Sequence, residues 1–106
     1  MSAQYNVLVT EPAFADLDEI LSYHTAVLAA PRAASKLLDG FEAIKTDLEQ
    51  LPTAYPKARD PKLALFGYHW APLAKSYAVF YRIDSSKETV IIDRILYQAR
   101  QWQELL

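Results

Sequence analysis

Hydrophobic residues recur with two different periods along this chain, and each period covers one half of it. In the first half they return every three or four positions, which is the period of an amphipathic helix. In the second half they gather in short runs rich in β-branched and aromatic residues, which are typical of strands. This order predicts an α+β fold, with a helical hairpin packed on one face of an antiparallel-rich four-stranded sheet.

A short strand at residues 5–10 precedes the two predicted helices. Thr10 can cap the first helix, which ends before Pro31 because a proline disfavours helical geometry in the residue before it. The second helix covers residues 32–51 and has the clearest periodic pattern in the chain. Its Gly40 costs about 1 kcal/mol relative to alanine, so we expect it to let the first helix approach closely.

Three strands are predicted in the second half, at residues 63–70, 76–84 and 88–97, and a short C-terminal helix from about residue 100. Gly67 is expected to form a bulge or a close backbone approach, and Pro72 to end the first of these strands. Alternation predicts that Tyr77, Val79, Tyr81 and Ile83 share one face of the middle strand, and Ala78, Phe80 and Arg82 the other. An extended loop before these strands carries Lys57, Arg59 and Lys62.

Composition narrows the function classes. The 106 residues correspond to one domain, 1–106, and the absence of cysteine excludes disulfides and thiolate metal sites. Two histidines without metal-binding spacing predict no metal, and nothing indicates a cofactor. With no signal peptide or apolar span, a cytoplasmic protein without membrane contact is expected.

Charge is divided unevenly between the two halves. Residues 1–52 hold three basic and eight acidic side chains, a net charge of −5, and the remainder holds eight basic and five acidic, a net charge of +3. Two interpretations stay open: the helices carry solvated acidic faces, or the sheet presents a cationic surface to a polyanion.

Several sequence words point to a family in combination. They are ADLDEI followed by Tyr23, the helix exit Leu51-Pro52, GYHW, SYAVFYRID and ILYQARQW. Their order resembles the RelE/ParE superfamily of toxins from bacterial type II toxin-antitoxin modules, over nearly the whole chain. The resemblance implies a cognate antitoxin as partner, in a hetero-oligomer. It also implies one of two targets: RelE-like members cut messenger RNA on the ribosome, whereas ParE-like members poison DNA gyrase.

RNA cleavage by attack of a 2′-hydroxyl needs a base, a cation for the phosphoryl oxygens and an acid. The resemblance implies that the RelE-like catalytic positions correspond to His69, Ala71, Ala78, Arg100 and Leu106 of this sequence. Only Arg100 matches identically, and His69 is a possible base because imidazole titrates near neutral pH. The chain would therefore be an enzyme only under the RelE-like hypothesis, with Arg100 and His69 as catalytic candidates.

Arg82, Arg94 and Lys75 are the candidate binding residues. An ordinary structural role competes with this one: Arg82 can pair with Asp93 across the hairpin for under about 1 kcal/mol, and Arg94 either does the same or stays solvated. Trp70 is expected to close an end of the core rather than to stack on bases.

Because four of the five nuclease positions are changed, the sequence favours a ParE-like toxin that inhibits gyrase. Ribosome-dependent RNA cleavage is the second hypothesis, and a non-toxic relic that only binds antitoxin is the third. The antitoxin is expected to bring an acidic-to-mixed tail with apolar anchors to the exposed sheet face and to the groove beside the helical hairpin.

Overall fold

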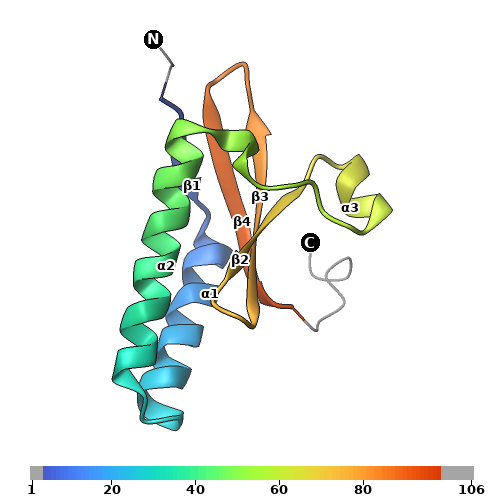
Figure 1. Cartoon of the computed structure of the whole chain (residues 1–106). Helices are drawn as coiled ribbons and strands as arrows, with labels where there is room; N and C mark the ends of the chain where they lie inside the picture. The colour runs from blue at the N-terminus through green and yellow to red at the C-terminus, as the bar shows by residue number, and fades with distance from the viewer. Residues whose placement is uncertain (1–3, 99–106) are drawn as a thin grey trace.

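A mixed four-stranded sheet forms the centre of the protein in a computed structural model, which describes residues 4–98 (Figure 1). The strand order is β1-β4-β3-β2, with β1 parallel to β4 and the other two pairings antiparallel. The strands are β1 Asn6–Val9, β2 His69–Leu73, β3 Tyr77–Asp84 and β4 Thr89–Tyr97. The α+β class and the antiparallel-rich sheet are therefore confirmed. The predicted C-terminal helix lies outside the described residues.

The helical hairpin covers one face of this sheet, as predicted (Figure 1). α1, Glu11–Ser22, begins after Thr10, whose hydroxyl accepts a hydrogen bond from the Ala13 N–H at 3.2 Å. A π-helical turn, Tyr23–Val27, extends α1, and Ala29 then reverses the chain with φ of 48°. α2, Pro31–Gln50, buries a stripe of five residues: Ala34, Leu37, Phe41, Ile44 and Leu48.

The predicted strand at residues 63–70 is wrong in its first half. A short helix, α3 Pro61–Leu65, stands there instead, because the Asp60 carboxylate accepts hydrogen bonds from the Lys62 and Leu63 N–H groups at 2.9 and 3.1 Å. β2 begins only at His69 and runs through Pro72, which an edge strand tolerates.

Both glycine predictions also need correction. Gly67 has a φ of 84° in the turn after α3, and no atom lies within 4 Å of the position of an added Cβ, so it forms neither a bulge nor a close approach. An added Cβ on Gly40 would lie 3.3 Å from the Leu73 Cδ1. The close neighbour of Gly40 is therefore strand β2, and α1 is not the reason for the glycine.

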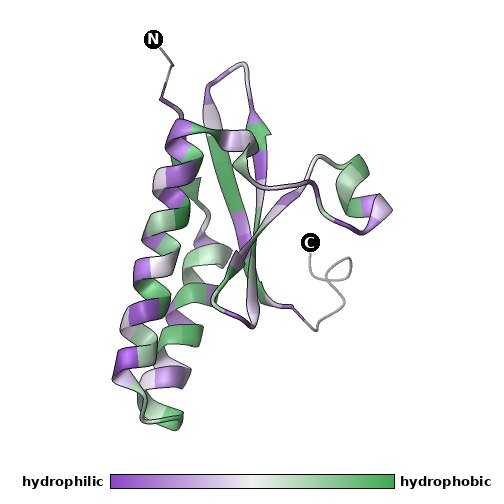
Figure 2. Cartoon of the chain, viewed as in Figure 1, coloured by the Kyte–Doolittle hydropathy of each residue, from purple (hydrophilic) through white to green (hydrophobic). Residues whose placement is uncertain are grey.

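The two faces of the sheet carry two separate hydrophobic clusters. The larger lies under the hairpin and includes Val79 and Tyr81, and the smaller lies on the other face and includes Ala78 and Phe80. This is the alternation that the sequence predicts for β3. Tyr81 is fully buried, and its hydroxyl donates to the Pro52 carbonyl oxygen at 2.8 Å. Figure 2 shows hydrophobic colour along much of β4, and hydrophobic and hydrophilic bands in alternation on α1 and α2.

Candidate functional site

His69, the predicted catalytic base, lies on β2 beside the larger cluster. Its ring stacks on Tyr81 with centroids 5.2 Å apart, and its Nδ1 is 2.9 Å from the Tyr55 carbonyl oxygen. A carbonyl only accepts, so the Nδ1 atom carries the proton in this hydrogen bond and the Nε2 atom keeps a lone pair in the neutral ring. The imidazole is thus fixed by a packed aromatic neighbour on the Tyr81 face of the sheet.

Arg82 lies on the opposite face and is paired, as one of the two interpretations predicted. Its Nε and Nη2 atoms donate to the two carboxylate oxygens of Asp93 at 2.6 and 3.3 Å. The hydrogen bond that Arg82 donates to Asp93 raises the pKa of Arg82. The guanidinium also lies 5.8 Å from the centre of the Tyr68 ring. This arginine is held in place by β4 and by an aromatic side chain, with 44% of its side chain exposed.

Arg94 forms an ion pair with Asp16 of the first helix. Its Nε and Nη2 atoms donate to Asp16 of α1 at 2.7 and 3.0 Å, and the Ile95 N–H donates to the same carboxylate at 3.0 Å. The hydrogen bond to Asp16 raises the pKa of Arg94. The predicted choice between a cross-strand pair and a solvated side chain therefore missed the actual partner.

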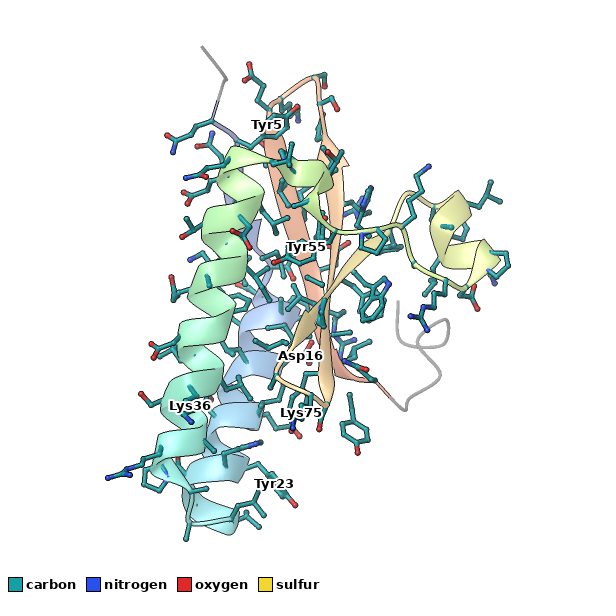
Figure 3. All side chains as sticks on the ribbon, in the orientation of Figure 1. Tyr5, Asp16, Tyr23, Lys36, Tyr55 and Lys75 are labelled. Atoms are coloured by element: carbon teal, nitrogen blue, oxygen red, sulfur yellow. The ribbon has the colours of Figure 1, made fainter. Side chains whose placement is uncertain are left out.

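Lys75, the remaining predicted cation within the described residues, is not gathered with Arg82. Lys75 is exposed in the turn between β2 and β3 (Figure 3). Arg82 lies five residues after Tyr77, the first residue of β3, which is roughly 17 Å along the strand. Lys75, just before β3, and Arg82 therefore lie toward opposite ends of this strand. Arg100 lies outside the described residues. Ala78, at the position of a strand arginine in the RelE-like pattern, is fully buried in the smaller cluster.

A groove lies between α1 and the end of the sheet, beside the helical hairpin. It has a volume of about 600 Å³ and we call it the α1–β4 groove. Its lining residues are Asp16, Glu19, Ile20, Tyr23, Tyr77, Arg94, Ile95, Leu96 and Tyr97. Figure 3 labels Asp16 and Tyr23, which line it from the first helix and its π-helical extension.

Tyrosines and carboxylates set the chemistry of the α1–β4 groove. Tyr77 and Tyr97 face each other across β3 and β4 in a T-shaped contact with centroids 5.9 Å apart. Burial, and then the neighbouring Tyr23 and Tyr97, raise the pKa of Tyr77, so its hydroxyl stays neutral at physiological pH. The wall therefore offers aromatic rings, phenol hydroxyls and the carboxylate of Glu19 to a bound chain. The tyrosines at strand spacing were the sequence signal that could have indicated this groove. No sequence signal indicated that Asp16 pairs with β4.

Neither a metal site nor a membrane span is present in the part of the chain that the structure describes. Within residues 4–98, no three His, Asp or Glu side chains gather closely enough to hold a metal ion. No helix within those residues is long and apolar enough to cross a membrane.

A mixed four-stranded sheet carrying a helical hairpin on one face is the fold of the RelE/ParE superfamily of type II toxins. A family model described as the ParE toxin of the type II toxin-antitoxin system parDE matches residues 7–102. The chain belongs to this ParE toxin family. The comparison with curated protein sequences gives no match.

Solved structures from three sources have a similar fold. The toxin-antitoxin complex RelBE2 from Mycobacterium tuberculosis is 27% identical, with a TM-score of 0.64 over 94% of this chain and 98% of that one. The chromosomal ParDE system from P. aeruginosa is 22% identical, with a TM-score of 0.68 over 89% and 96%. The archaeal RelE-RelB complex from Pyrococcus horikoshii OT3 is 13% identical, with a TM-score of 0.58 over 92% and 98%.

Proposed function

We propose that this toxin arrests growth when it is not bound to its antitoxin, and that it does so by ParE-like inhibition of DNA gyrase. The family model supports this choice, because it is a ParE model and covers most of the chain. Gyrase as the target would place its action in the cytoplasm. A single domain spanning residues 1–106 is part of the proposal.

The buried state of the two strand alanines is the observation that carries the choice of target. Ala71 and Ala78 occupy RelE-like catalytic positions, and both have no exposed surface. A phosphorane needs a positive group within hydrogen-bond reach, which an alanine methyl cannot supply. The nearby Arg82 and Arg94 already donate to carboxylates. Redirecting either to RNA would cost an existing charge-assisted pair.

We further propose that the antitoxin inserts a chain segment into the α1–β4 groove. The three solved relatives are toxin-antitoxin systems or complexes, which supports an antitoxin partner. The pairing of β4 with β1 ends at Ile92, beside this groove. Beyond Ile92, side chains form hydrogen bonds with the backbone edge of β4. The Thr10 hydroxyl donates to the Asp93 carbonyl oxygen, and the Asp16 carboxylate accepts from the Ile95 N–H. A segment bound here would pack on tyrosines at the border of the sheet, as a helix or an extended strand.

Purified gyrase gives the direct test of the proposed target. The toxin alone should block supercoiling of relaxed plasmid, and an equimolar amount of antitoxin should restore it. In parallel, programmed ribosomes with a defined message should yield no cleavage products. Message cut on the ribosome, with supercoiling unaffected, would contradict the proposal.

Ribosome-dependent cleavage is the alternative, and the likeness to RelBE2 is the observation that favours it. Under this alternative His69 and Arg100 are the catalytic residues. His69→Ala and Arg100→Ala should then each abolish growth arrest. If the toxin inhibits gyrase instead, both variants should still arrest growth.

A further inference from the structure

Two exposed apolar residues stand at the end of α3, on the element that projects from the sheet away from the helical hairpin (Figure 1). Leu65 is 84% exposed and Phe66 is 62% exposed. The Leu65 fraction is the largest among the exposed large hydrophobic residues of the described chain. Figure 2 shows the hydrophobic colour on this projecting segment. We call Leu65 and Phe66 the α3 tip; adjacent exposed residues of this kind mark an interaction surface more often than scattered ones do.

The α3 tip is held rigidly although it is exposed. The Asp60 carboxylate caps the start of α3, and Leu63 is buried against Ala78 and Phe80 in the smaller cluster. The Phe66 N–H donates to the Lys62 carbonyl at 3.2 Å, and the Tyr68 N–H donates to the Leu63 carbonyl at 3.0 Å. A surface that is already ordered loses little conformational entropy when a partner binds, which favours affinity.

Three cations lie on the same projecting segment as the α3 tip, two in the loop before α3 and one within the helix. Lys57, Arg59 and Lys62 are all exposed, and the Arg59 guanidinium lies 5.5 Å from the centre of the Trp70 ring. Asp60 is the only acidic residue between positions 50 and 83, and its Oδ1 atom accepts the backbone hydrogen bonds that cap α3. An exposed apolar tip on a segment with three cations is complementary to an apolar pocket bordered by carboxylates.

We propose that the α3 tip and these three cations form the surface by which the toxin engages its protein target, and that the target offers an apolar pocket with an acidic rim. This inference rests on the proposed function, in which that protein is gyrase. Duplex DNA is the poorer fit, because three cations contact few phosphates compared with the roughly six to ten that DNA-binding proteins neutralise. The α3 tip lies outside the lining of the α1–β4 groove, so target binding and antitoxin binding can be measured separately.

The test compares two double variants in which exposed apolar residues become serine. Leu65→Ser with Phe66→Ser removes the α3 tip, and Val27→Ser with Leu28→Ser is the control, because these residues are 67% and 50% exposed at the end of the helical hairpin. The tip variant should bind gyrase holoenzyme about ten- to a hundredfold more weakly, the usual effect of losing central apolar anchors. It should also lose growth arrest, while it retains antitoxin affinity and its thermal unfolding midpoint. The control should match the wild type in all four measurements.

A charge variant tests the contribution of the cations. Lys57→Glu with Lys62→Glu should also weaken gyrase binding, and raising the salt concentration should weaken the wild type more than this variant.

Three results would overturn the inference: growth arrest at wild-type strength by the tip variant, an equal loss of antitoxin binding, or retardation of duplex DNA by the wild type that the tip variant has lost. The third result would make the partner a nucleic acid. Failure of the proposed function is recognised separately, because wild-type toxin would then not bind gyrase at all. In that event, loss of growth arrest in the tip variant alone would still support the α3 tip as the surface for another protein target.

Discussion

Asp16 joins the first helix to the last strand by binding Arg94 and the backbone beside it. One carboxylate accepts from two guanidinium nitrogens, at 2.7 and 3.0 Å, and from the Ile95 N–H at 3.0 Å. It does so just past the point where β1 stops pairing with β4. The same carboxylate therefore provides a hydrogen-bond acceptor for a backbone N–H at the edge of the sheet. It also holds together the α1 and β4 residues that line the α1–β4 groove.

Replacing Asp16 by asparagine should destabilise the protein by about 1–3 kcal/mol, because the charge-assisted bonds are lost and Arg94 keeps a partly buried charge. Urea unfolding at neutral pH measures this loss. Asp18→Asn is the control, since Asp18 is an exposed acid on the same helix. Equal stability of the two variants would contradict the structural role of Asp16.

Gly40→Ala should raise the free energy of unfolding by less than about 1 kcal/mol. The helix gains about 1 kcal/mol from alanine, and moving the Leu73 Cδ1 atom away from a 3.3 Å contact removes part of that gain. Gly40→Val should instead destabilise the protein, because its methyl groups have less room beside Leu73 and valine is a poorer helix former. Thermal unfolding of both variants checks this, and a lower midpoint for the alanine variant would contradict it.

The hydroxyl of Tyr55 should give a pH-dependent contribution to stability. Burial, and then a 2.8 Å hydrogen bond to Asp47, raise the pKa of Tyr55 from 10.0 to about 12. The folded state therefore favours the neutral phenol, so the contribution is fully present below pH 10 and is lost as the pH rises toward 12. The stability difference between wild type and Tyr55→Phe, measured by urea unfolding, should shrink across this range. A difference that stays constant from pH 8 to 12 would contradict the assignment.

Antitoxin affinity should depend on the α1–β4 groove. Tyr23→Ala removes an exposed aromatic wall, so we expect affinity to fall about tenfold or more. Phe14→Ala is the matched control, because Phe14 is 56% exposed on α1 and is absent from the groove lining, whereas Tyr23 is 48% exposed. Calorimetric titration with the antitoxin measures both, and equal affinities would place the antitoxin elsewhere.

The elements with strong local patterns were predictable from the sequence. The periodic stripe of α2 and the apolar runs of β3 and β4 define their elements without tertiary information, and the pairing of Arg82 with Asp93 follows from a hairpin. α3 was missed because the run at residues 63–66 is apolar and short, which fits a strand as well as a helix. The preceding Asp60-Pro61 pair was the usable signal for a helix start.

The candidate site was less predictable because it is assembled by contacts between distant residues. Asp16 and Arg94 are 78 positions apart, and no local pattern indicates that they meet. The count of cations on the sheet half left a cationic surface open as one of two interpretations, and the fold places a carboxylate beside both Arg82 and Arg94. The partner of Gly40 was likewise set by the packing of β2 on α2.

Pulse labelling in bacteria after induction of this chain alone tests the proposed target most directly. Labelled thymidine and labelled methionine report the rates of DNA and protein synthesis in the same culture. Inhibition of gyrase predicts that thymidine incorporation falls first, with methionine incorporation following later. An earlier fall in methionine incorporation would contradict the account and would direct attention to His69 and Arg100 as a nuclease site.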